Sequence, residues 1–224
     1  MFDLNNCLIL CRIIDLGIME LSEKQLHIIK VTEELFAKNG FDGTSVRMIA
    51  KTANINIAMI SYYFGSKEKL LETIVNYRIS NFKIEIDQVI SDGTSYLNKV
   101  DSIIAIIIKR IHKGRRIQKL VHFEFSRENP KIDFSNYLKQ KEENLELFRT
   151  LIEAGQKEGI FSKDVNIELI IPTILGSYFN LYYNKKIYSK VHGLFKEEDF
   201  DQFVFTTLTQ HIQRTIKAIL TYEE

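Results

Sequence analysis

The sequence is poor in the residues that cross-link a chain or interrupt its regular structure. Its 224 residues include two prolines and two cysteines. No apolar run is long enough to span a bilayer. Cys7 and Cys11 lie close together, and no His or Cys cluster has metal-site spacing, so the pair fits a reducing compartment better than a disulfide scaffold. We therefore expect a folded cytoplasmic protein that has no membrane segment and no disordered tail.

Motifs of catalysis are also missing. The serines lack the sequence of a nucleophile elbow, and there is no glycine-rich phosphate loop. The most suggestive polar cluster is His122 with Glu124 and Arg127, for which a purely structural histidine is the plainer interpretation. We expect no enzyme, no cofactor and no metal. The five histidines are scattered over the chain, at His27, His112, His122, His192 and His211.

Apolar residues make up 45% of the chain and the net charge is +1. This composition can bury a substantial core, the length suits a small domain plus a larger one, and the near-neutral charge argues against a general polycation. Periodicity beyond residue 72 is helical throughout, so we predict an all-α fold. The isoleucine-rich run at 103–108 is interpreted as buried helix. The expected helices are 20–39, 67–91, 95–113, 115–127, 134–158, 166–184 and 197–222.

Residues 44–70 are the most informative segment, because they predict two short helices, a tight turn and the start of a third helix. Thr44 is a candidate N-cap for the first of these helices, and Asn56 for the second. Asn54 can end the first helix in the left-handed region, and Gly65 ends the second. Two helices joined in this way form a helix-turn-helix that reads DNA.

The second short helix has an unusual surface. Ile57, Ile60 and Phe64 share one face and are expected to pack inward. The opposite face carries Ala58, Met59, Ser61, Tyr62 and Tyr63, which suits a helix in a DNA groove, although the tyrosines can also be explained as core. Arg47, Lys51, Lys67 and Lys69 against Glu68 give residues 44–70 a local charge of +3. Lys67 at a helix start is expected to grip a phosphate, while Arg47 and Lys51 can also be ordinary solvated residues.

These residues resemble the DNA-binding region of TetR-family transcriptional regulators. Two departures stand out: Asn54 replaces the usual turn glycine, and Ser61 stands where an aromatic is common, which moves the expected base contact to Tyr62 and Tyr63. The matching positions are Gly40-Phe41, Thr44-Ser45, Ile49-Ala50, Tyr63-Phe64 and Ser66-Lys67-Glu68 followed by Leu70. The DNA-contacting residues implied are Thr44, Ser45, Arg47, Ala58, Met59, Tyr62, Tyr63 and Lys67.

The expected domains are a helix-turn-helix domain at 19–66 and a helical ligand-binding and dimerisation domain at 67–224. Residues 1–18 are an extension, either an added helix or a leader created by a misassigned start, and we expect Met19 to be the start. The last two long helices carry large apolar residues around much of their circumference, which favours a homodimer over complete burial within one subunit. Gly176-Ser177 would permit close helix approach.

The resemblance implies a repressor that binds a palindromic double-stranded operator and is released by a small molecule, through movement of the 67–91 helix. A small apolar or amphipathic effector is expected, although a hydrophobic core explains the same residues. Two alternatives stay open: an all-helical ligand carrier or enzyme that keeps the fold without binding DNA, and a regulator controlled by a protein partner. The expected ligand-lining residues are Ile104, Ile108, Phe123, Tyr137, Phe148, Tyr178 and Tyr182.

Overall fold

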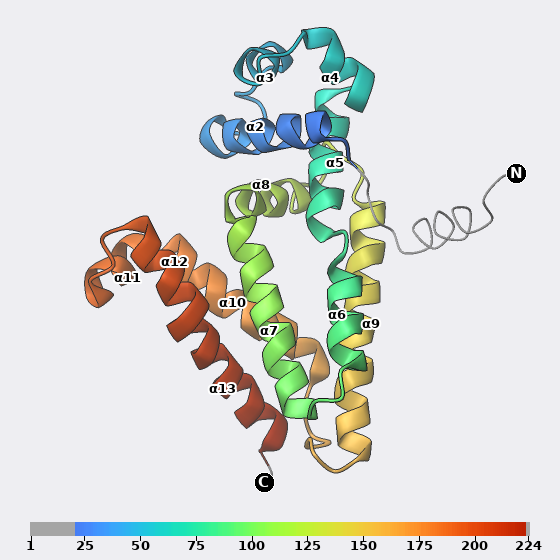
Figure 1. Ribbon diagram of the computed structural model, residues 1–224, viewed down its shortest axis with the longest axis vertical. Coiled ribbons are helices and arrows are strands. Elements are labelled where there is room, and N and C mark those ends of the chain that lie inside the picture. Colours follow the sequence, from blue (N-terminus) through green and yellow to red (C-terminus); the bar gives the residue numbers. More distant parts are fainter. Residues whose placement is uncertain (1–20, 223–224) are drawn as a thin grey trace, which may run out of the picture. The chain divides into compact units, whose positions relative to one another are not determined.

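The computed structural model describes residues 21–222, and every regular element in that range is helical, which confirms the predicted fold class (Figure 1). The predictions for residues 1–18, including Cys7 and Cys11, fall outside the described residues. None of the helices described is long and apolar enough to cross a membrane.

The elements are α2 (Glu23–Asn39), α3 (Val46–Thr52), α4 (Ile57–Phe64), α5 (Lys67–Ile79), α6 (Phe82–Ser91), α7 (Tyr96–Lys113), α8 (Arg115–Phe125), α9 (Ser135–Lys157), the 3-10 turn η1 (Ile167–Leu169), α10 (Ile170–Tyr183), α11 (Lys185–His192), α12 (Glu197–Phe203), the π-helical segment η2 (Val204–Leu208) and α13 (Thr209–Thr221).

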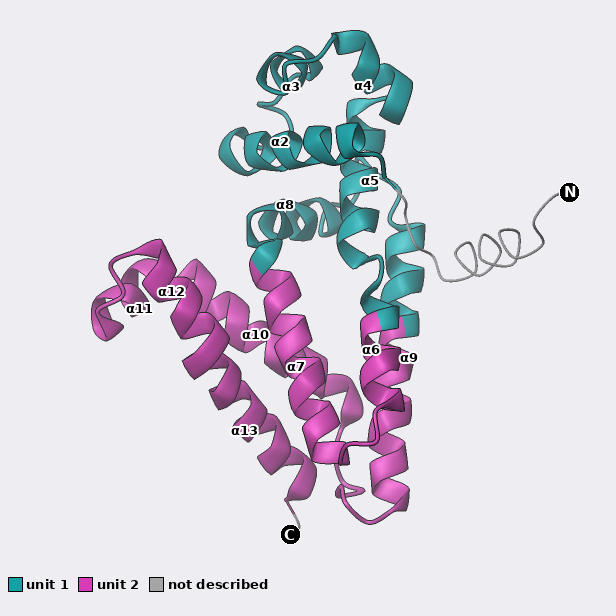
Figure 2. Cartoon of the chain, in the orientation of Figure 1, with its two compact units in different colours: residues 1–84, 113–143 teal, residues 85–112, 144–224 magenta. Residues whose placement is uncertain are grey.

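The chain divides into two compact units, coloured teal and magenta in Figure 2. The N-terminal unit comprises the described residues as far as Ile84 together with Lys113–Glu143. The C-terminal unit comprises Glu85–His112 and the chain from Asn144 onward. A domain boundary at residue 66 stays a prediction, and the compact N-terminal unit also takes in α5, α8 and the start of α9.

The N-terminal unit is built around α2. Ser22 caps this helix by accepting a hydrogen bond from the Gln25 amide, and Gly40 ends it with φ 74°. α8 packs against α2, and Arg78 of α5 donates to the carboxylate of Glu33, Nε to Oε1 at 2.6 Å. The core of the unit consists of Ile28, Ile29, Phe36, Phe41, Ile49, Ala50, Ile60, Phe64, Leu70, Leu71, Ile74, Val75, Ile117, Val121, Ile132 and Phe134.

The C-terminal unit contains the isoleucine-rich run, which lies in α7 as a buried helix and confirms the prediction. Ile103, Ile104 and Ile108 are fully buried. Asp101 of α7 ties this helix to α13, because its carboxylate pairs with Lys217 at 2.6 Å and its backbone carbonyl accepts from the Gln213 amide at 2.9 Å.

Two sequence expectations for the helices were wrong, and a third was confirmed with a local irregularity. The helix expected at 67–91 is divided into α5 and α6, because Asn81 takes a left-handed conformation with φ 63°. The helix expected at 197–222 runs without a break from Glu197 to Thr221, and it includes the π-helical segment η2, after which the Thr209 hydroxyl donates to the Val204 carbonyl at 2.8 Å. The stretch expected to be a loop before Gly193 is the short helix α11.

Candidate nucleic-acid interface

The turn between α2 and α3 positions the start of the helix-turn-helix. Thr44 is fully buried, and its hydroxyl donates to the Gly40 carbonyl at 2.8 Å. The predicted cap is therefore wrong by one residue: Ser45 caps α3, with its Oγ accepting from the Met48 amide at 3.1 Å. Thr44 is turned inward because the chain must close the end of α2, so its side chain offers nothing to DNA.

The turn between α3 and α4 follows the sequence prediction closely. Asn54 has φ 53°, and Asn56 caps α4 by accepting from the Ala58 amide at 2.9 Å. The carbonyl of Ala53 lies 3.1 Å from Nε2 of His27 in α2. Ile49 and Ala50 of α3 are buried, and so is Ile60 of α4. These contacts fix the angle between two helices too short to be stable alone.

Helix α4 carries four of the eight predicted DNA-contacting residues, Ala58, Met59, Tyr62 and Tyr63. Ala58 and Ser61 are exposed, Met59 and Tyr63 are half-buried, and Tyr62 is 82% exposed. The rings of Tyr62 and Tyr63 meet edge to face, with centroids 5.1 Å apart. Exposed aromatic rings with hydroxyl tips suit a groove in which the hydroxyls reach phosphate.

Ile57 differs from its prediction. We expected it to pack inward with Ile60 and Phe64, and those two are buried, but Ile57 is 44% exposed. It is the first residue of α4, and a side chain in the first turn of a helix leans back toward the N-terminus, past the edge of the core. The recognition helix therefore presents an isoleucine where it begins.

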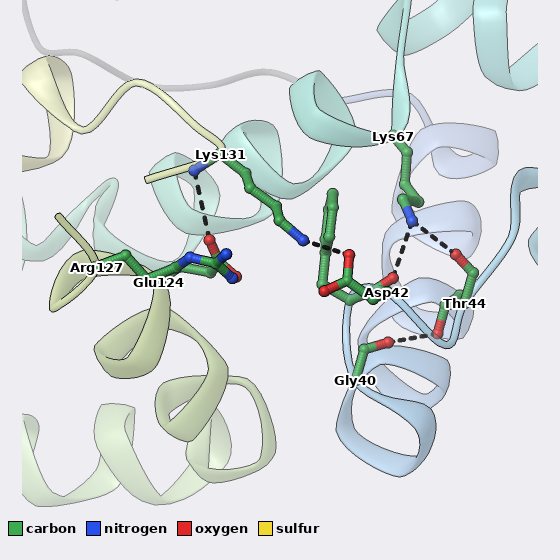
Figure 3. Close-up of polar contacts among 8 residues, drawn as sticks. Gly40, Asp42, Thr44, Lys67, Glu124, Arg127 and Lys131 are labelled. Carbon is green, nitrogen blue, oxygen red and sulfur yellow. Dashed lines mark hydrogen bonds and ion pairs between the residues drawn. The ribbon is translucent and has the colours of Figure 1, made fainter. Parts of the chain in front are cut away.

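Lys67 holds the turn that precedes α3. Its ammonium donates to the carbonyls of Phe41 and Thr44 at 2.9 and 3.0 Å, and it lies 4.1 Å from the centroid of the Phe41 ring (Figure 3). Two of the three ammonium protons are thus used within the chain. These bonds give Lys67 a role in positioning the start of α3, and the phosphate contact expected for it stays a prediction.

The connection between α8 and α9 reaches the same turn. Lys131 forms an ion pair with Asp42, and its ammonium lies 4.9 Å from the Phe41 ring (Figure 3). The hydrogen bond from Lys131 lowers the pKa of the Asp42 carboxyl. The buried carboxylate of Glu124 accepts from Arg127 at 3.1 Å and from the Lys131 amide at 3.4 Å. Glu124 and Arg127, members of the polar cluster noted in the sequence, therefore stabilise this connection.

The predicted DNA contacts are gathered on α3 and α4, which pack together at one end of the N-terminal unit (Figure 1). Arg47 and Lys51 are exposed on α3, and Ser45 is exposed at its start. Lys69 pairs with Glu72 at 2.9 Å. Of the eight predicted contacts, only Thr44 is buried, and Ile57 is a further exposed residue of α4. The other seven are exposed or half-buried: Ser45, Arg47, Ala58, Met59, Tyr62, Tyr63 and Lys67.

The predicted ligand-lining residues divide between the two units. Ile104, Ile108, Phe148 and Tyr178 are buried in the C-terminal unit, where the ring of half-buried Tyr182 stacks on that of Tyr178. Tyr137 is half-buried in the N-terminal unit, and Phe123 is 63% exposed there, so Phe123 does not have the surroundings of a cavity-lining residue.

Sequence reasoning missed a polar cluster in the C-terminal unit. His112 is buried, and its ring nitrogens lie 2.9 Å from the Tyr178 hydroxyl and 2.7 Å from a carboxylate oxygen of Asp201. The partners are 66 and 89 residues away along the chain, so no local pattern could have revealed them. His122, for which the sequence analysis preferred a purely structural role, is exposed.

The geometry of residues 45–64 defines a helix-turn-helix DNA-binding protein. Residues 28–74 match the family model described as bacterial regulatory proteins, tetR family. YttP of Bacillus subtilis, described as a probable HTH-type transcriptional regulator, is 31% identical over 144 residues, which are 62% of this chain and 68% of YttP. The chain therefore belongs to the TetR family and is a DNA-binding transcriptional regulator.

Two further relatives extend the comparison. The HTH-type transcriptional repressor NicS of Pseudomonas putida is 26% identical over 156 residues, covering 63% of this chain and 67% of NicS. The structure of the regulator FadR from Bacillus subtilis, in complex with stearoyl-CoA, superimposes with a TM-score of 0.65. That match covers 87% of this chain and 98% of FadR at 15% identity, and it establishes a common fold.

Replacing Lys67 by Met tests its positioning role. The variant keeps the apolar stem but leaves the carbonyls of Phe41 and Thr44 without the ammonium, so we expect a loss of about 1–2 kcal/mol in the free energy of unfolding. DNA affinity should fall while the slope of log affinity against log salt stays unchanged. Lys69→Met is the matched control, since Lys69 is exposed and its surface ion pair contributes little. A salt slope lowered by about one in Lys67→Met would instead indicate a phosphate contact.

Proposed function

We propose that this protein is a homodimeric, cytoplasmic repressor that binds a palindromic operator through α3 and α4 and leaves it when a small apolar or amphipathic molecule binds. The observation that carries the proposal is the exposed face of α4, with Tyr62 82% exposed beside small and apolar residues. A helix surface whose only role was solubility would not need two adjacent aromatic side chains such as Tyr62 and Tyr63. We propose no catalytic role.

Dimerisation is supported by apolar groups that the C-terminal helices leave uncovered. On α10 and the turn before it, Leu169 and Tyr183 are 58% and 49% exposed, and on α13 Ile219 is 41% exposed. Gly176 of α10 lies between Leu169 and Tyr183 in the sequence and is exposed. A Cβ added there would meet no atom within 4 Å. A helix with a glycine on an open face can be approached closely by a helix from a second copy.

The effector class is supported by the interior of the C-terminal unit. Phe148 and Tyr178 are buried with the α7 isoleucines, and His112 brings one polar group into these surroundings. An apolar body with one polar end would match such an interior. FadR, which shares the fold, holds stearoyl-CoA, a ligand of that kind.

Release from DNA would follow from thermodynamic linkage. A ligand that favours one arrangement of the helices must lower operator affinity by the factor by which the operator lowers ligand affinity. Because Lys67 of α5 and Lys131 after α8 both hold the turn that precedes α3, a shift of either element would displace the recognition helix. Ligand-induced release then requires only a small displacement of the turn between α2 and α3, without unfolding of any segment.

The operator should be a palindrome with half-site centres about one helical turn, roughly 34 Å, apart. We expect Tyr62→Phe and Tyr63→Phe each to weaken operator binding by about fivefold, as the loss of one hydrogen bond predicts, with no change in salt slope because tyrosine is neutral. Tyr188→Phe, a tyrosine of α11 whose hydroxyl bonds to Asn180, is the matched control. Binding by both variants that equals the parent would argue against DNA contact by this face.

Gly176→Leu tests the proposed dimer interface. Within one subunit the added side chain meets open space and improves helix propensity, so the fold should be retained. In a dimer that packs α10 against a partner helix it should clash and raise the dimer dissociation constant by at least tenfold, as sedimentation would measure. Gly93→Leu, at another glycine with open space around it, is the control. A parent protein that is monomeric at micromolar concentration would exclude the interface.

A thermal-shift screen tests the effector class. At one hundred times its dissociation constant, a compound that binds only the folded state stabilises it by about 2.7 kcal/mol. We expect such shifts from long-chain acyl or aromatic compounds, and the same compounds should reduce operator binding in a mobility-shift assay. Release by small, highly charged metabolites alone, with no response to any apolar compound, would contradict this part of the proposal.

A further inference from the structure

The recognition helix has no side chain suited to paired hydrogen bonds with a base. α4 contains no Arg, Lys, Asn, Gln, Asp or Glu. Asn56 is the residue immediately before α4. Its side-chain oxygen caps the helix by accepting a hydrogen bond from the backbone amide of Ala58. Guanine is most often read in the major groove by Arg or Lys and adenine by Asn or Gln, each through two hydrogen bonds. α4 therefore cannot distinguish bases in this way.

What α4 offers at its start is apolar. Ile57 is 44% exposed, Ala58 is exposed and Met59 is half-buried. The N-terminal residues of a recognition helix are the ones that contact base edges. An isoleucine side chain in water at this point gains free energy if it is covered by an apolar group of the DNA. Among the base edges of the major groove, only thymine presents a methyl group.

We propose that Ile57, supported by Ala58 and Met59, reads the 5-methyl group of thymine, and that this apolar contact is the main source of base discrimination under α4. The inference rests on the proposed function, since it requires α4 to enter the major groove. Tyr62 and Tyr63 are then left to contact phosphates, and Arg47 of α3 is a further exposed cationic residue of the helix-turn-helix. Each operator half-site must accordingly contain at least one thymine whose methyl group faces the start of α4.

Replacing thymine by deoxyuridine tests this with the parent protein. An operator is first selected from random DNA, and its thymines are then replaced one at a time. Deoxyuridine keeps every hydrogen-bonding group of thymine and loses only the methyl. We expect one or two positions in each half-site where the change weakens binding about fourfold, the equivalent of one methyl group left uncovered. Replacing the thymine in both half-sites should reduce operator affinity by the product of the two single reductions.

The variant Ile57→Ala completes the comparison. It should bind the thymine operator more weakly than the parent and should no longer distinguish thymine from deoxyuridine at the sensitive positions. Tyr62→Phe is the control, and it should keep the full difference between the two bases. Because Ile57 is partly exposed, we expect the melting temperature of Ile57→Ala to stay near that of the parent.

Two results would overturn the inference while leaving the proposed function intact. One is an operator in which no deoxyuridine replacement weakens binding by the parent. The other is a sensitive position whose penalty is the same in the parent, in Ile57→Ala and in Met59→Ala. A parent protein that selects no DNA sequence at all would overturn the proposed function and this inference together.

Discussion

The position of the recognition helix depends on the turn between α2 and α3, which is held by hydrogen bonds to its own carbonyl groups. Thr44 closes the turn from inside through Gly40, and Lys67 grips the carbonyls of Phe41 and Thr44 from the start of α5. Backbone carbonyls that lose such partners cost free energy, so the turn keeps one conformation. Ser45 can cap α3 only because this conformation places it there.

The two units differ in the buried polar groups that connect their helices. In the N-terminal unit, Glu33 of α2 pairs with Arg78 of α5, and Glu124 of α8 pairs with Arg127 in the segment that follows it. In the C-terminal unit, His112 brings polarity between Tyr178 and Asp201 in an aromatic environment that also includes Phe205, whose ring centroid lies 5.0 Å from that of the histidine. The first arrangement holds α2 to α5 and α8 to the segment that follows it. The second joins α7 to α10 and α12.

The sequence predicted the features that depend on neighbouring residues. Asn54, Asn56 and Gly65 were correctly assigned to turns and caps because left-handed conformations and caps are properties of single residues. The break at Asn81 was missed, since neither glycine nor proline marks it. The ion pair of Lys131 with Asp42 joins residues 89 apart, and pairing at that separation is decided by packing. Burial also decided which of two adjacent residues caps α3. Thr44 and Ser45 are equally suitable N-caps by residue type, but Thr44 is buried and Ser45 is the cap.

The central claim, that α3 and α4 form a sequence-specific DNA-binding face positioned by the turn before them, can be measured by amide hydrogen exchange. The parent protein is compared with its selected operator and with a shuffled duplex of the same composition and length. The account predicts that exchange slows over residues 45–69 with the operator and changes much less there with the shuffled duplex. Equal protection by both duplexes, or protection confined to residues 144–222, would contradict it.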